Sequence, residues 1–99
     1  MINSNAFNDL ESIHVKWVSW SPYAFCDHTT GTIKYNQSWQ WEGETLNGTS
    51  RAVSLAHEKG IKTMIKPHVW MSDHSYTGSI SLPDSSWENW QRTYKKYIL

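Results

Sequence analysis

Two strand-like runs separated by a helical pattern constrain the fold of this chain more than any other feature. Residues 14–21 and 61–69 are rich in β-branched and aromatic residues, and Pro22 closes the first run. Between the runs, Thr45 suits the N-cap of a helix reaching about Lys59, and Gly60 is placed to end it. Strands joined by helices in this way lie parallel. The sequence therefore predicts an α/β protein with a parallel sheet.

Further helices are predicted on both sides of this unit. Phe7, Leu10 and Ile13 are spaced three apart among polar residues, as on an amphipathic helix. Residues 85–88 (Ser-Ser-Trp-Glu) match a capping box, so a last helix is expected to begin there. Its stripe at helical spacing consists of Trp87, Trp90, Tyr94, Tyr97 and Ile98. Residues 23–44 are predicted to be a long loop, which makes the expected order α-β-α-β-α.

Two parallel strands leave both sheet edges open and cannot cover the apolar faces of three helices. A complete (β/α)8 barrel needs about 250 residues, and this sequence has 99. The expected fold class is thus a partial TIM barrel, one incomplete domain over residues 1–99. The remainder of the barrel is its expected partner.

Charge and cysteine content narrow the possible functions. Nine basic and nine acidic residues give a net charge of zero, which argues against nucleic acid or an anionic membrane surface as a partner. No apolar run approaches the roughly 20 residues of a membrane span. Cys26 is the only cysteine, and the spacing of His68, Asp73 and His74 matches no usual zinc pattern. No metal and no cofactor are expected.

The tryptophan content is unusual. Seven tryptophans occur in a hydrophilic chain whose mean hydropathy is −0.63. Large aromatic residues supply core area in small proteins, and carbohydrate-binding proteins use their flat faces against sugar rings. Trp17, Trp87 and Trp90 are expected in the core. Trp39, Trp41 and Trp70 fall in or beside predicted loops, where they remain candidates for sugar contacts.

The second strand-like run ends in polar residues. Because side chains alternate along a strand, Met64, Lys66 and His68 are expected on one face, with His68 at the carboxyl end. Ligands of parallel α/β proteins bind at that end. An exposed strand end with two solvated polar residues would show the same pattern.

Four segments together resemble a known family. The chain is similar to the TIM-barrel glycoside hydrolases around family 113, the β-mannanase-like enzymes. The resemblance rests on Trp17-Val18-Ser19-x-x-Pro22-Tyr23-x-Phe25, Trp41-x-Gly43-Glu44-Thr45, Gly60-Ile61-Lys62-x-Met64-x-Lys66-Pro67-His68-Val69-Trp70 and Trp87-x-x-Trp90-x-x-x-Tyr94-x-x-Tyr97-Ile98. It implies that the two strand-like runs are the second and third barrel strands, and that this chain is an N-terminal fragment.

The resemblance also implies what the chain lacks. Retaining barrel glycosidases carry a Glu acid/base after strand four and a Glu nucleophile on strand seven, and both positions would fall beyond Leu99. Such a pair must lie about 5–5.5 Å apart. Within the chain, only Glu42 or Glu44 with Asp73 could converge on the strand ends, and none has the apolar setting that raises a carboxyl pKa. No catalytic residue is therefore assigned.

The expected contribution is to the substrate cleft. Candidate substrate-binding residues are Lys66, His68, Trp70, Trp41, Glu44 and Tyr23. Five of the six have a specific structural alternative: Lys66 and His68 as a pair bonded to backbone, Trp70 as packing against the next loop, Glu44 as a charge at a helix N-terminus, and Tyr23 as support for the turn after Pro22. The alternative function is a non-catalytic carbohydrate-binding protein that uses Trp39, Trp41 and Trp70.

Overall fold

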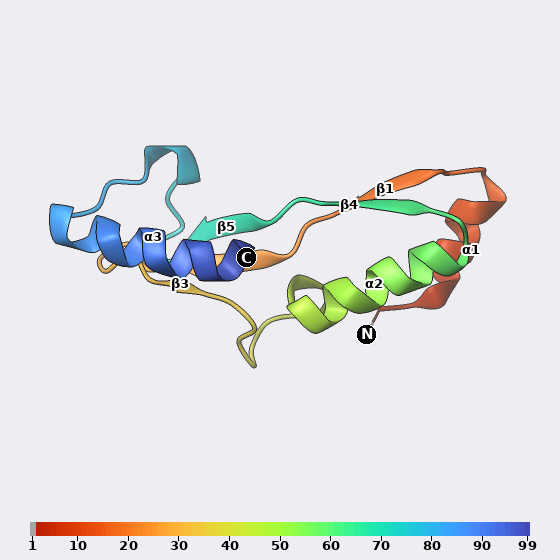
Figure 1. Ribbon diagram of the computed structural model, residues 1–99, viewed down its shortest axis with the longest axis horizontal. Coiled ribbons are helices and arrows are strands. Elements are labelled where there is room, and N and C mark those ends of the chain that lie inside the picture. Colours follow the sequence, from red (N-terminus) through yellow and green to blue (C-terminus); the bar gives the residue numbers. More distant parts are fainter. Residues whose placement is uncertain (1) are drawn as a thin grey trace. The chain divides into compact units, whose positions relative to one another are not determined.

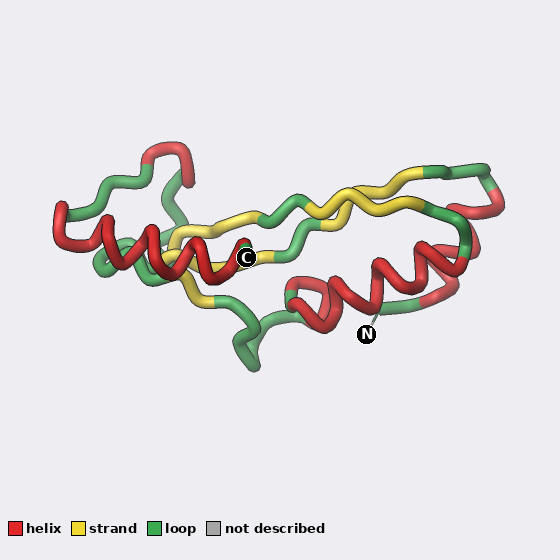
Figure 2. The backbone as a smooth tube through the Cα atoms, viewed as in Figure 1, coloured by secondary structure: helices red, strands yellow, loops and turns green. Residues whose placement is uncertain are grey.

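Over its described residues the protein is a mixed α/β chain with three helices and two small sheets (Figures 1 and 2). The computed structural model describes residues 2–99. The elements are α1 (Ser4–Ser12), β1 (Trp17–Trp20), β2 (Tyr23–Cys26), β3 (Ile33–Lys34), a 3-10 turn (Glu42–Glu44), α2 (Leu46–Glu58), β4 (Lys62–Ile65), β5 (His68–Met71), a second 3-10 turn (Thr77–Ser79) and α3 (Asp84–Ile98). The predicted helices all form. Among the helices of residues 2–99, none has the length and apolar character needed to cross a bilayer.

The chain divides into two compact units. The first comprises the residues up to Pro22 together with Ser38–Lys66, and the second comprises Tyr23–Gln37 together with Pro67–Leu99. Each unit contains one sheet and its own hydrophobic core.

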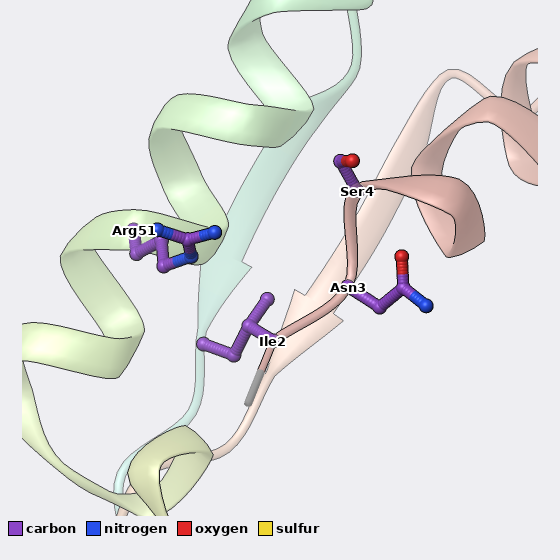
Figure 3. A pocket seen from close by; sticks show the side chains of 4 residues that line it. All are labelled: Ile2, Asn3, Ser4 and Arg51. Atoms are coloured by element: carbon purple, nitrogen blue, oxygen red, sulfur yellow. The ribbon is translucent and has the colours of Figure 1, made fainter.

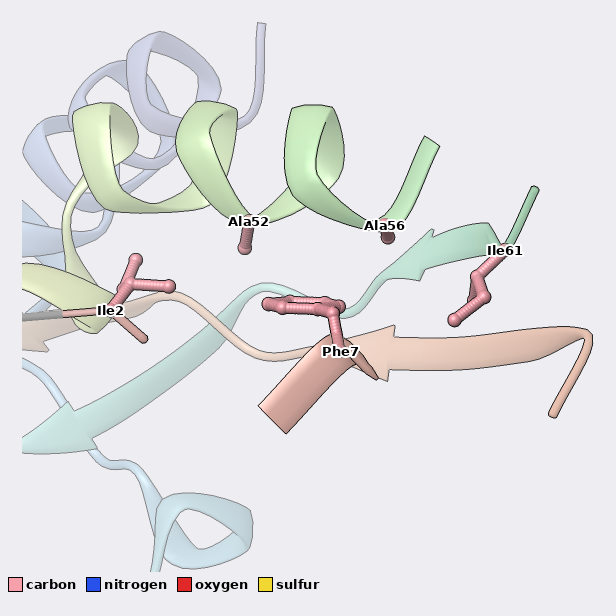
Figure 4. Close-up of a cluster of buried hydrophobic side chains, with 5 residues drawn as sticks. All are labelled: Ile2, Phe7, Ala52, Ala56 and Ile61. Atoms are coloured by element: carbon pink, nitrogen blue, oxygen red, sulfur yellow. The ribbon is translucent and has the colours of Figure 1, made fainter. Parts of the chain in front are cut away.

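In the first unit, β1 and β4 pair in parallel, as the sequence predicts. Helices α1 and α2 bury their apolar sides against one face of this pair, where Val18 and Trp20 pack against the core. Figure 4 shows the core side chains converging from α1, from α2 and from the residues that precede α1 and β4: Ile2, Phe7, Ala52, Ala56 and Ile61. Alanines on α2 let the helix approach the sheet closely, which suits a small core.

The ends of α2 are those predicted. The Thr45 hydroxyl accepts a hydrogen bond from the Gly48 amide at 3.1 Å, which satisfies one of the unpaired N–H groups of the first turn. Gly60 has φ +70°, the left-handed conformation that follows many helices. Thr45 and Gly60 therefore fix where α2 begins and ends.

In the second unit, the strand order is β3-β2-β5, with β2 antiparallel to β3 and parallel to β5. Helix α3 covers one face of this sheet. The core residues are Ala24, Cys26, Ile33, Met71 and Tyr97. Trp90 and Tyr94 stack in parallel at 5.0 Å on α3 and pack against the same core.

The two long strands predicted at 14–21 and 61–69 are each interrupted, which corrects the sequence prediction. β1 ends at Trp20 and β4 at Ile65, and new strands begin at Tyr23 and His68. In both parallel pairs a residue faces the one 45 positions later, as Trp17 faces Lys62 and Tyr23 faces His68. Pro22 and Pro67 are also 45 positions apart, and each lies in the interruption between two strands. Since proline has no backbone N–H, neither can donate a hydrogen bond to a ladder there.

The loop predicted at 23–44 is also wrong in part. It contains β2, β3 and the 3-10 turn at Glu42–Glu44. Pro22 cannot donate a ladder hydrogen bond and therefore predicts the end of the strand, whereas pairing of β2 with β5 resumes at Tyr23. Residues 23–26 form a strand because they pair with a segment 45 residues away, and such pairing leaves no pattern in the local sequence.

Two smaller expectations also fail. Helix α3 begins at Asp84, after Pro83 and without a side-chain cap, so Ser85 is already helical and the capping box does not form. A proline before the first turn and an acidic residue within it favour this start. Trp17 is 61 % exposed rather than in the core, because it lies on the face of β1 opposite the helices, over the Lys62 ammonium. Trp87 and Trp90 are partly buried.

Candidate functional site

The face of the β2–β5 pair that α3 leaves uncovered is aromatic. Alternation along β2 turns Ala24 and Cys26 into the core and Tyr23 and Phe25 to the other side, where both are half-buried. Alternation along β5 places His68 and Trp70 on that side as well. The register brings His68 opposite Tyr23 and Trp70 opposite Phe25. We call these four residues the aromatic face.

Three of the six predicted substrate-binding residues meet on the aromatic face. The Tyr23 and His68 rings lie edge to face with centroids 5.2 Å apart, and the Tyr23 and Trp70 centroids are 6.2 Å apart with tilted planes. Trp70 is 50 % exposed. A half-exposed indole beside a phenol and an imidazole offers an apolar surface with polar edges, on which a ligand with an apolar face and polar substituents can pack.

His68 is not at the carboxyl end of its strand, contrary to the sequence prediction. It is the first residue of β5, because the strand restarts after Pro67. Lys66 lies after β4, where its amide donates to the Trp20 carbonyl at 2.8 Å, and its side chain is exposed. Met64 and Lys66 belong to the first unit and His68 to the second. The predicted alignment of Met64, Lys66 and His68 along one strand therefore does not occur.

Trp41 and Glu44 belong to the first unit, in the segment before α2. The Trp41 ring lies over Gly43 so closely that a Cβ there would fall 2.1 Å from the ring. The Trp20 indole donates to the Gly43 carbonyl at 3.0 Å, and the Gln40 amide donates to Glu44 Oε2 at 3.4 Å. The Trp-x-Gly-Glu-Thr segment thus has a structural explanation as the lead-in to α2.

Trp41 also lines an apolar pocket of about 420 Å³ in the first unit. The other lining residues come from α1, the residues before it, and β1: Ile2, Asn3, Ala6, Phe7, Leu10, Val18, Ser19 and Trp20. A second hollow, of about 280 Å³, lies between the start of α1 and α2 and is lined by Ile2, Asn3, Ser4 and Arg51 (Figure 3). Asn3 caps α1 there by accepting from the Asn5 amide. Neither hollow contains more than one of the predicted residues.

The two acidic residues nearest the ends of β2 and β5 are poor general acids. Asp27 Oδ1 accepts hydrogen bonds from the amides of Thr30 and Thr29, each at 2.8 Å, and these lower its pKa to about 2. Hydrogen bonds from Ser75 lower the pKa of Asp73, with a smaller contribution from His28. Both carboxylates are therefore ionised at neutral pH, whereas a glycosidase acid needs a raised pKa.

Residues 2–99 contain no group of three side chains suited to hold a metal ion. Sequence reasoning missed two residues at the ends of the strands, His28 and Ser72. The His28 ring nitrogen Nδ1 lies 2.8 Å from Ser72 Oγ, although the residues are 44 apart in sequence. Only the parallel register of β2 with β5 brings them together, so no local signal could have found this pair.

Comparison with known proteins gives no further assignment: no family model matches the sequence, and neither curated proteins nor solved structures contain a significant match.

Proposed function

We propose that this chain is a segment of a retaining glycoside hydrolase of the TIM-barrel class that acts on a β-linked, mannan-like polysaccharide or oligosaccharide. The segment contributes substrate contacts and not the catalytic carboxylates. The observation that carries the proposal is the gathering of Tyr23, His68 and Trp70 on the uncovered face of β2 and β5.

The arrangement of sheets and helices supports a barrel segment. Both long pairings are parallel, and in each unit helices cover one face of the sheet. The opposite faces carry large exposed side chains, Trp17 and Met64 in the first unit and Trp70 in the second. In a (β/α)8 barrel the helices cover the outer face, and the inner face is filled by side chains from the other strands. Remaining barrel strands would complete these faces.

The acids near the strand ends support a segment without the catalytic carboxylates. The Thr30 and Thr29 amides hold Asp27 as a carboxylate, and the Ser75 hydroxyl and amide do the same for Asp73, so neither is suited to protonate a leaving group near neutral pH. The acid/base and the nucleophile would come from barrel strands outside residues 1–99.

The test is to extend the reading frame in both directions and assay the longer product on β-mannan and aryl β-mannosides. We expect hydrolysis with retention of configuration by the longer protein and no turnover by the 99-residue chain. Trp70→Ala in the longer protein should lower kcat/KM at least tenfold, the loss of about 1.4 kcal/mol of binding in the transition state. Trp39→Ala is the matched control and should change it little.

A longer product without activity on any β-linked glycan would refute the hydrolase proposal. The second candidate is a non-catalytic carbohydrate-binding protein, and the exposure of three tryptophans favours it: 63 % for Trp39, 56 % for Trp41 and 50 % for Trp70. That function predicts glycan binding by the 99-residue chain that Trp39→Ala and Trp41→Ala weaken, with no catalytic domain in the extended reading frame.

A further inference from the structure

The carboxyl ends of β2 and β5 lie at the same edge of their sheet. The two strands are parallel, with Cys26 opposite Met71 at their last residues. The ladder extends one residue further, because the Ser72 amide donates to the Cys26 carbonyl at 2.9 Å. Residues 27–28 and 72–73 therefore leave the sheet side by side, at the edge where parallel α/β proteins bind ligands.

Two hydrogen bonds join His28 to Ser72 at this edge. The His28 backbone amide donates to Ser72 Oγ at 2.9 Å, and the His28 ring nitrogen Nδ1 lies 2.8 Å from the same oxygen. Because the amide donates to Oγ, the hydroxyl can direct its proton to Nδ1. The neutral imidazole then carries its proton on Nε2 and can donate it outward.

Helix α3 fixes the loop that carries His28. The Ser86 hydroxyl donates to the Thr29 carbonyl at 3.0 Å, and the Asn89 amide donates to the Thr30 carbonyl at 3.0 Å. From the other side, Asp27 accepts the amides of Thr29 and Thr30. The position of His28 is thus set before any ligand arrives, which reduces the entropy lost on binding.

Asp73 supplies an acceptor beside this donor. It directly follows Ser72, and its Oδ1 accepts the Ser75 amide at 3.0 Å. His28 contributes to the lowered pKa of the Asp73 carboxyl, after the bonds from Ser75, because the positive form of the ring attracts the carboxylate. An imidazole N–H and a carboxylate at one edge match two neighbouring hydroxyls of a sugar, one accepting and one donating.

A serine bonded to a histidine also occurs in acyl-transfer enzymes. Such enzymes need backbone N–H groups aimed at the developing oxyanion. Here the amides of His28, Thr29 and Thr30 are taken by Ser72 and Asp27, and those of His74 and Ser75 by Met71 and Asp73. The edge is therefore built to bind hydroxyls rather than to form an acyl-enzyme.

We propose that His28, Ser72 and Asp73 form a polar carbohydrate subsite that continues the aromatic face beyond Trp70. Ser72 orients the imidazole, His28 Nε2 donates to one sugar hydroxyl, and the Asp73 carboxylate accepts from its neighbour. Trp70 lies on β5 and precedes Ser72, the first residue after the strand, by two positions, so one sugar chain can contact both Trp70 and the polar subsite. The choice of carbohydrate as ligand rests on the proposed function.

The test measures binding of a soluble β-mannan oligosaccharide to the 99-residue chain by NMR titration, with amide spectra to verify that each variant is folded. His28→Asn and Asp73→Asn should each weaken binding about fivefold to tenfold, the loss expected for one net hydrogen bond. His74→Asn is the matched control, since His74 lies in the same loop at φ +63°, a conformation that asparagine tolerates. It should leave the affinity unchanged.

Ser72→Ala separates orientation from contact. It should weaken binding less than His28→Asn and should shift the His28 ring signals in the absence of sugar. If Trp70→Ala abolishes binding while the His28 and Asp73 variants bind normally, the subsite is refuted and the proposed function stands. If wild-type protein shows no sugar-dependent shifts at all, both fail. Hydrolysis of p-nitrophenyl acetate that depends on Ser72 would overturn the subsite in favour of acyl transfer.

Discussion

Substitution of Gly31 tests whether contact with α3 holds the loop that carries His28. Gly31 has φ +74°, and a Cβ built there would lie 2.9 Å from the Ser86 carbonyl oxygen and 3.1 Å from Trp90 Cβ. Gly60 is the matched control, since its φ is +70° and a Cβ there would meet nothing within 4 Å. Both glycines adopt the left-handed backbone conformation, but only a Cβ at Gly31 would collide with neighbouring atoms.

The expected magnitudes follow from this difference. An alanine in the left-handed region costs about 1 kcal/mol, so Gly60→Ala should lower the free energy of unfolding by about that amount. Gly31→Ala adds the displacement of a backbone carbonyl and a partly buried side chain, worth about 1–3 kcal/mol more. Its total loss should therefore be about 2–4 kcal/mol.

Urea unfolding followed by residue-resolved NMR measures both variants. Signals of Met71 and Tyr97 report the second unit, and those of Ala56 and Ile61 report the first. Gly31→Ala should destabilise the second unit by clearly more than Gly60→Ala destabilises the first. Equal losses in the two variants would show that the loop does not pack against α3 as described, and the fixed position of His28 would lose its support.

Two predictions concern pH. Because the pKa of Asp27 is lowered to about 2 from its usual 3.8, its stabilisation of the His28 loop is present above pH 4 and is lost as pH falls toward 2. The Thr29 and Thr30 amide signals should move toward random-coil positions in that range. Asp27→Asn should remove this transition. Burial, followed by the charge of Tyr94, raises the pKa of Tyr97 to about 12 from 10. The stability that the neutral phenol gives the second unit is therefore full below pH 10 and lost as pH rises through 12. Ultraviolet titration should find one late-ionising phenol that is absent from Tyr97→Phe, and its absence from the wild type would contradict the burial of Tyr97.

The sequence predicted the helices better than the strands. Thr45 and Gly60 are local signals, and α2 begins and ends where they indicate. The limits of a strand depend on the strand with which it pairs. The sequence did not predict β2, because Tyr23–Cys26 pairs with residues 45 positions later and a proline, Pro22 or Pro67, directly precedes each of the two strands. The sequence also did not predict that Trp17 is exposed, because β-propensity alone does not indicate which face of β1 the helices cover.

In the candidate site, too, the sequence indicated residue types, whereas long-range strand pairing decided which residues come together. Tyr23, His68 and Trp70 were singled out by residue type, and the register of β2 with β5 places them together. The register also explains why His28 and Ser72 were not singled out, since each is an ordinary loop residue in the sequence and a pair only in the fold. Trp41 was a candidate because it falls in a predicted loop, and its contact with Gly43 gives it a structural role that its sequence position did not reveal.

Carbohydrate binding by the aromatic face is tested most directly by an NMR titration of the 99-residue chain with a soluble β-mannan oligosaccharide, observing the indole N–H signal of each tryptophan. We expect saturable shifts of the Trp70 signal together with the ring signals of Tyr23 and His68, and loss of these shifts in Trp70→Ala. Shifts confined to Trp39 and Trp41, or no shifts up to the solubility limit of the sugar, would contradict the assignment of carbohydrate binding to the aromatic face.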